Sequence, residues 1–130
     1  MLNSVAQGEY AIGLTFESNA YAYVAGGQRE IQLIYPQDGT FVTEEALVLV
    51  KGGPTPEAGR RLYDLLLSRD TQIALLEQAY RRPSRGDIKV SEHAELPDIQ
   101  DIKVFPVDEA RALANREVFL TQWKDLEKGH

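Results

Sequence analysis

The sequence predicts an α/β chain with a small mixed sheet flanked by helices. Three short runs, at residues 11–16, 31–35 and 46–50, are apolar and bounded by residues that favour turns, as buried strands are. Other segments carry apolar residues every three or four positions, which is typical of amphipathic helices. The 130 residues are enough for one domain that buries a core.

The stretch GEYAIGLTFESNAYAYVAGG, residues 8–27, predicts a strand, a turn and a helix. Ser18 and Asn19 are good N-cap residues, because their side-chain oxygens accept from the free N–H groups of a first helical turn. We expect the helix over residues 20–25, ended by the two glycines that follow. A strand that runs into a helix N-terminus often holds an anionic or polar ligand, but the same pattern suits a corner without a ligand.

The remaining strands and turns of the first half follow from composition. Residues 1–7 predict the last turns of a helix that Gly8 ends, and PQDG at residues 36–39 is turn chemistry. The run ALVLV, residues 46–50, is apolar on both faces. It therefore predicts an interior strand with a neighbour on either side.

Three helices are expected in the second half, over residues 56–68, 71–80 and 107–126. Thr55 offers a capping hydroxyl, and Pro56 suits the first helical position. An apolar stripe runs along each helix, as in Leu62, Leu65 and Leu66; Ile73, Leu76 and Tyr80; and Phe119, Trp123 and Leu126.

The loops of the second half are polar. RRPSRG at residues 81–86 is either an anion contact or a solvated surface loop, and the surface loop is the favoured interpretation. Residues 88–90 suggest a short strand, and the acidic residues 91–101 suggest a surface loop. Lys51 precedes two glycines, whereas a phosphate-binding loop needs its lysine after them.

Composition and spacing argue against several functions. A net charge of −6 argues against nucleic-acid binding, and the absence of cysteine excludes disulfides and thiolate zinc sites. His93 has no second imidazole at metal-ligand spacing, and Glu44 and Glu45 would point to opposite faces of a strand. No membrane-spanning run and no signal peptide is visible. We predict no enzyme, no cofactor and no metal site.

Four segments, in order, resemble bacterial solute-binding proteins of ABC importers, in the branch that holds ferric-iron and 2-aminoethylphosphonate binding proteins. They are VAQGEYAIGLTFE, EALVLVKGGPTPEAGRRLYDLLLSRDTQIAL, AYRRPSRGDI and ANREVFLTQW. The resemblance implies part of a type II periplasmic-binding-protein fold. It also implies that residues 1–130 are a single partial domain, that the first half is absent, and that the parent protein is periplasmic.

What the resemblance implies for function is a two-lobed receptor that closes around a solute and delivers it to the membrane subunits of the importer. In the iron-binding branch two adjacent tyrosines supply phenolate oxygens to the metal. Ser18 and Asn19 stand at those positions here, while Tyr21 and Tyr23 lie further on. Ferric iron is therefore the less favoured ligand.

The favoured solute is a small organic anion such as a phosphonate or a phosphate ester, because a helix N-terminus suits an anion. The residues expected to line this half of the cleft are Thr15, Glu17, Ser18 and Asn19, with Thr40 as a weaker candidate.

Two alternatives remain open. The chain could be a truncated fragment that binds no solute and folds as a homo-oligomer, including a domain-swapped dimer exchanged through residues 37–43, because the strand at residues 46–50 expects partners. A transcription-regulator effector domain shares the resembled fold, but it would need a DNA-binding region that this sequence lacks.

Overall fold

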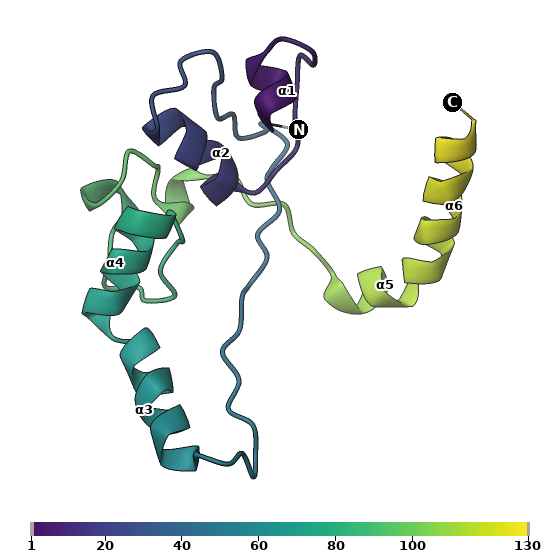
Figure 1. The fold of residues 1–130 in the computed structure, drawn as a ribbon. Helices are drawn as coiled ribbons and strands as arrows, with labels where there is room; N and C mark the ends of the chain where they lie inside the picture. Colours follow the sequence, from purple (N-terminus) through teal and green to yellow (C-terminus); the bar gives the residue numbers. More distant parts are fainter. Residues whose placement is uncertain (1, 130) are drawn as a thin grey trace.

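The computed structural model describes residues 2–129, and the chain is α-rich (Figure 1). The prediction for residues 1–7 therefore begins one residue outside the described part. The helices, in chain order, are α1 (Leu2–Ala6), α2 (Glu17–Ala25), α3 (Pro56–Leu66), α4 (Arg69–Ala79), α5 (Glu109–Ala114) and α6 (Arg116–Lys128). Two 3-10 turns, η1 (Val90–Glu92) and η2 (Ile99–Asp101), lie between α4 and α5.

The predicted small mixed sheet is wrong for the described residues 2–129. Residues 11–16, 31–35 and 46–50 form no strand, and neither do residues 88–90. The bridge that does form joins Thr40 to Val104 in parallel, with the Thr40 N–H donating to the Lys103 carbonyl at 2.9 Å. A strand exists only when a neighbour accepts and donates its backbone hydrogen bonds, and the three apolar runs are not brought beside one another.

Helix α2 begins earlier than expected. Phe16 is the N-cap residue, in an extended conformation and without a side-chain cap, so Ser18 and Asn19 lie within the first helical turn. The N-cap assignment for those two residues is therefore wrong, and the helix starts at Glu17 instead of residue 20. The predicted end is confirmed: Gly26 closes the helix, and Gly27 follows with φ +88°, a conformation that suits glycine.

Helices α3 and α4 match the predicted positions within two residues. Pro56 occupies the first turn of α3, but the Thr55 hydroxyl makes no capping hydrogen bond. The break between the helices is sharp because Ser68 caps α4: its Oγ accepts from the Thr71 N–H at 3.4 Å.

The long helix expected over residues 107–126 is divided into α5 and α6. Asp108 starts α5, with its Oδ1 accepting from the Arg111 N–H at 3.0 Å. Asn115 interrupts the run, and its Nδ2 donates to the Arg111 carbonyl at 2.9 Å. Short polar side chains such as asparagine compete for backbone hydrogen bonds, which explains the break.

The core is small and lies where α2, α4 and the residues around η1 meet. Its buried cluster consists of Tyr21, Leu76, Ile88, Val90 and Leu96. The Tyr21 ring meets the Tyr80 ring edge-on at 4.9 Å between centroids. The Tyr21 hydroxyl accepts from the Glu95 N–H at 2.9 Å, so a polar tip inside the core is satisfied.

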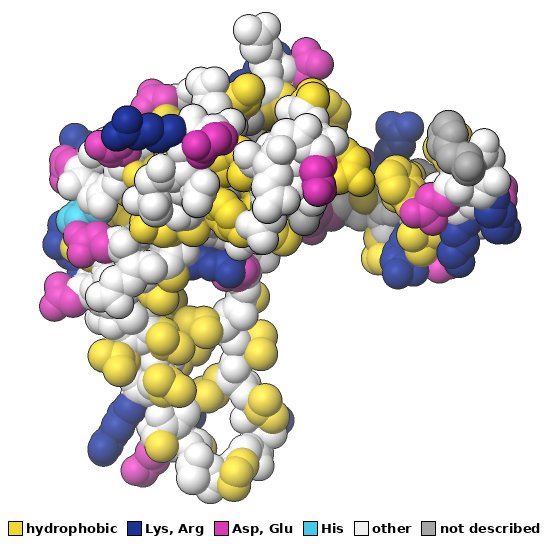
Figure 2. Space-filling model, turned by 45° about the horizontal axis from the view of Figure 1, so that its top comes forward, with side chains coloured by type: hydrophobic (Ala, Val, Ile, Leu, Met, Phe, Trp, Pro, Cys, Tyr) yellow, Lys and Arg dark blue, Asp and Glu magenta, His cyan; other side chains and the backbone are white. Residues whose placement is uncertain are grey.

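Two parts of the chain lie away from this core. In Figure 1 the extended chain before α3 runs down beside that helix, and α5 and α6 form an arm on the other side. Apolar side chains are visible along both parts in the space-filling view of Figure 2. No helix of the described residues is long and apolar enough to cross a membrane.

Candidate functional site

Three segments far apart in the sequence meet at the first turn of α2, around Glu17. The Arg82 guanidinium binds the Glu17 carboxylate through two bonds, Nε to Oε1 at 2.8 Å and Nη2 to Oε2 at 2.9 Å. The Tyr35 hydroxyl donates to the same Oε2. Both charged side chains are about one-fifth exposed, at 21% each. This Glu17–Arg82–Tyr35 cluster fixes the start of α2 against the loop that follows α4.

The loop that carries Arg82 is held by a buried amide. Gln72 on α4 is 8% exposed, and its Oε1 accepts from the Ser84 N–H at 2.9 Å. Its Nε2 donates to the Leu66 carbonyl at 2.8 Å. Because both ends of the Gln72 amide are bonded, the loop after α4 has a defined position relative to α3 and α4.

The electrostatics of the cluster follow from its partial burial. Burial, and then the hydrogen bond and charge of Glu17, raise the pKa of Tyr35 to about 12. Burial alone would lower the pKa of the Arg82 guanidinium, but the Glu17 hydrogen bond and charge outweigh it and the pKa is raised. Tyr35 thus stays neutral and Arg82 stays charged. The Arg82 Nη1 atom is buried and finds no partner among residues 2–129.

The other residues predicted for this turn present free polar groups. Thr15 and Asn19 are exposed, and Ser18 is partly so. Within residues 2–129, none of the three side chains makes a hydrogen bond, and the N–H groups of Glu17 and Ser18 have no acceptor. These N–H groups lie at the positive end of the α2 dipole, so the turn can accept a small anion.

Among the described residues, no hydrogen bond joins Thr40 to the first turn of α2. Its backbone pairs with Lys103 and Phe105 on the chain before α5. Four of the five predicted residues therefore share one turn, as neighbours in sequence must, while Thr40 lies on a separate contact.

The tyrosines considered for iron have structural partners. The Tyr21 hydroxyl is bonded in the core to Glu95, and the Tyr23 hydroxyl donates to the Asn3 Oδ1 at 2.7 Å. His93 binds Glu77 at 2.9 Å. Residues 2–129 hold no group of three or more histidine, aspartate or glutamate side chains that could bind a metal ion.

Two surface hollows lie elsewhere. One, of about 320 Å³, is polar and lies beside α1 and the end of α2, lined by Asn3, Ala6, Gln7, Tyr23, Gln28 and Glu30. The other, of about 160 Å³, lies between the extended chain and α3, lined by Leu49, Arg60, Tyr63 and Asp64. Neither hollow includes a residue predicted for the site.

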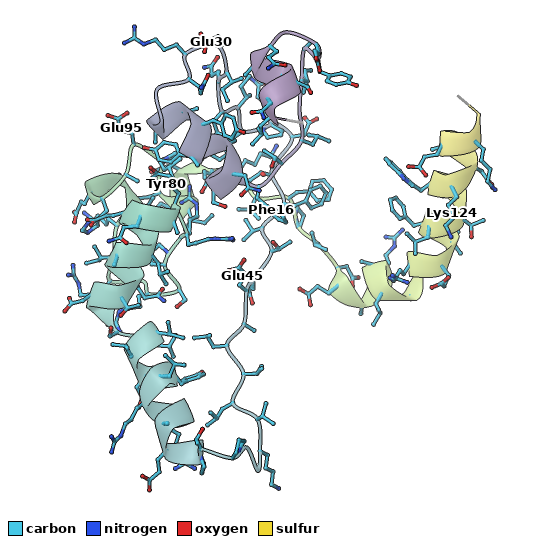
Figure 3. All side chains as sticks on the ribbon, viewed as in Figure 1. Phe16, Glu30, Glu45, Tyr80, Glu95 and Lys124 are labelled. Carbon is cyan, nitrogen blue, oxygen red and sulfur yellow. The ribbon has the colours of Figure 1, made fainter. Side chains whose placement is uncertain are left out.

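Sequence reasoning missed Arg82 and Tyr35. Arg82 lies in the RRPSRG loop, which is mostly exposed, as its favoured interpretation as a surface loop expects. Arg81 and Arg85 form exposed ion pairs with Glu45 (labelled in Figure 3) and Asp87. Arg82 differs, because its ion pair with Glu17 is largely buried. Tyr35 was assigned only to a strand. One feature of the sequence could have suggested such a partner. Glu17 directly follows an apolar run, and a carboxylate that is partly buried beside apolar residues needs a cation close by. Nothing local identifies that cation, because 65 residues separate the partners.

The cluster orients the start of α2, and the first N–H groups of that helix have no acceptor among the described residues. The class of protein, a solute-binding protein, comes from a family comparison. The chain belongs to the bacterial extracellular solute-binding protein family, which matches residues 1–81. This family serves ABC importers outside the cytoplasm and is typically non-enzymatic. No curated protein and no solved structure matches the chain.

Proposed function

We propose that this chain binds a small organic anion, such as a phosphonate or a phosphate ester, at the first turn of α2, for delivery to the membrane subunits of an ABC importer. The observation that carries the proposal is the set of free donors at that turn: the N–H groups of Glu17 and Ser18 have no acceptor among the described residues. The side chains of Thr15, Ser18 and Asn19 are equally free of hydrogen bonds there. Residues 1–130 would act as one partial domain, with a further lobe closing the cleft.

Within this proposal Glu17 has a positioning role. Its carboxylate already accepts from Arg82 and Tyr35, so it has little capacity left for a solute. Arg82 also neutralises the carboxylate, which would otherwise repel an anion at the neighbouring N–H groups. Thr40, which pairs with the chain before α5, remains the weaker candidate.

Isothermal titration calorimetry with 2-aminoethylphosphonate and with inorganic phosphate tests the proposal. Loss of a hydrogen bond to a charged group costs roughly 1.5–3 kcal/mol, so Ser18→Ala should weaken binding about tenfold or more. Ser4→Ala is the matched control, because Ser4 also lies in a helix and its side chain has no hydrogen bond among the described residues. Equal affinity in both variants would remove Ser18 from the site, and no binding by the unaltered chain would refute the proposal.

Ferric iron is the less favoured solute. Ser18 and Asn19 offer neutral oxygens, whereas ferric iron prefers anionic ones. We expect no visible phenolate-to-iron absorption band on adding a ferric salt. A band that disappears in Tyr21→Phe or Tyr23→Phe would contradict this expectation.

The alternative of a self-associated chain that binds no solute has its own supporting observation. The extended residues 46–50 expose apolar side chains, with Val48 at 81% and Val50 at 74%. Calorimetry separates the alternatives, because only the receptor releases or absorbs heat with an added anion.

A further inference from the structure

The side chain of Gln72 on α4 is buried although it is polar, with 8% of the residue exposed. Its Oε1 accepts from the Ser84 N–H at 2.9 Å and from the Ser84 hydroxyl at 3.3 Å. Its Nε2 donates to the Leu66 carbonyl at 2.8 Å. A buried amide is stable only when both of its ends are bonded, so Gln72 ties the end of α3 to the loop after α4.

A second contact joins the same loop to the end of α3. The Arg85 Nη1 atom donates to the Leu67 carbonyl at 3.3 Å, while the rest of the guanidinium binds Asp87. Arg85 and Asp87 are 39% and 51% exposed, so water competes for these bonds. The Gln72 amide is shielded from water and is therefore the stronger constraint on the loop.

Pro83 passes this constraint on to Arg82. The proline ring fixes its own φ at about −65° and restricts the residue before it to extended conformations. Ser84, which is bonded to Gln72, therefore cannot shift without moving the backbone of Arg82.

Arg82 carries the constraint to the start of α2. Its guanidinium holds the Glu17 carboxylate through two bonds, at 2.8 and 2.9 Å. Glu17 is the first residue of α2, and its N–H group and that of Ser18 are the donors assigned to the solute above. An unbroken series of hydrogen bonds and stiff covalent links thus joins Gln72 to the proposed solute site.

We propose that Gln72 is a positioning residue for solute binding. Its side chain touches no solute and sets the affinity of the α2 turn by holding Arg82 against Glu17. This inference rests on the proposed function and extends it, because it places a determinant of affinity in the interior of the molecule, on a different helix from the turn.

Calorimetry with 2-aminoethylphosphonate gives the first test. Gln72→Met keeps the size of the side chain and removes the amide, and coupling of this kind should weaken binding about two- to thirtyfold. Gln78→Met is the matched control, because Gln78 lies on the same helix, is exposed, and makes no side-chain hydrogen bond among the described residues. Equal affinity in the two variants would overturn the proposal.

A double-mutant cycle shows whether the effect passes through Arg82. In an Arg82→Ala background the route from Gln72 to Glu17 is already broken, so Gln72→Met should cost no further affinity. The same additional loss in both backgrounds would contradict a positioning role.

Gln72→Glu provides a rescue that depends on pH. A protonated carboxyl has one donor and a free acceptor oxygen, so it can replace both amide bonds, whereas a carboxylate cannot donate to the Leu66 carbonyl. Burial raises the pKa of a carboxyl, which keeps the proton on at about pH 5 and releases it toward about pH 9. The affinity of Gln72→Glu relative to the unaltered chain should therefore be highest at the lower pH. A ratio that does not fall as pH rises would count against the proposal.

Amide hydrogen exchange measured by NMR tests the same link without a solute. The N–H groups of Asn19 and Ala20 each donate to the Phe16 carbonyl at 3.1 Å, and they should exchange faster in Gln72→Met than in Gln78→Met. Unchanged exchange rates would show that Gln72 does not hold the turn. If the unaltered chain binds no anion, the proposed function fails and this measurement still decides the role of Gln72. If the chain binds but Gln72→Met binds equally well, only the present inference fails.

Discussion

The part of the chain built from α2, α4 and the residues around η1 differs from the part built from the extended chain, α3, α5 and α6. In the first, Leu76 is fully buried and belongs to a cluster of five buried apolar residues. In the second, the described residues of α3, α5 and α6 include none that is buried. The exposed helices α3 and α6 carry a stronger amphipathic pattern than the core helices α2 and α4, so the pattern alone does not decide burial. The difference lies in whether a distant segment arrives to cover the apolar face.

The largest expected effect on stability comes from shortening an apolar side chain to alanine in each of the two parts. Leu76→Ala should lower the free energy of unfolding by about 2–5 kcal/mol, because it leaves a cavity in the core. Leu126→Ala, on the exposed stripe of α6 with 67% exposure, should change it by less than about 0.5 kcal/mol. Urea denaturation followed by circular dichroism measures both, and equal losses would show that α6 is also packed.

The second prediction compares the stability lost when a largely buried ion pair and an exposed one are broken. Arg82→Ala should cost about 1–3 kcal/mol, since it removes two hydrogen bonds from a Glu17 carboxylate that is only one-fifth exposed. Arg81→Ala is the matched control, because Arg81 pairs with Glu45 at 49% and 78% exposure, where ion pairs contribute about 0–1 kcal/mol. If both variants lose the same stability by denaturation, the Glu17–Arg82–Tyr35 cluster does not hold the start of α2.

A pH prediction follows from Tyr35, whose pKa is raised from 10.0 to about 12 by burial and Glu17. Between these values the unfolded chain has lost the proton that the folded chain keeps. The stability from this group is therefore fully present below pH 10 and is lost as pH rises through about 12. Ultraviolet titration of tyrosinate should show a step near pH 12 that is missing in Tyr35→Phe, and a titration with the same late step in both proteins would contradict the assignment.

The smallest effect concerns Asp98 at the edge of the core. The hydrogen bond from the Ser91 side chain, with those from the backbone N–H groups of Ser91 and Val90, holds the pKa of Asp98 below its ordinary 3.8. Its contribution to stability is present above pH 3.8 and is lost as pH falls through the lowered value. The stability advantage over Asp98→Asn should thus shrink in acid, as thermal melts at pH 7 and pH 3 can measure; an advantage that is constant with pH would argue against these bonds.

Features within short segments of the sequence predicted helix positions, but they did not predict contacts between distant segments. The positions of α3 and α4, and the glycine end of α2, follow from the residues within each segment. The start of α2 did not, because Phe16 has no capping side chain, and the capping signals at Ser18 and Asn19 predicted a start at residue 20, three residues too late. The turn that carries the candidate site was predicted, but the interactions that hold it were not.

The sequence by itself determined where α3 and α4 lie, because helical hydrogen bonds join residues four apart and apolar stripes repeat every three or four positions. It also determined that residues 46–50 are extended and apolar on both faces. Only the tertiary structure decided that no sheet forms among residues 2–129, because a strand takes its hydrogen bonds from another segment. It likewise decided that Arg82 and Tyr35 meet Glu17, since these partners lie 65 and 18 residues away and the spacing of residues along the chain carries no information about such contacts.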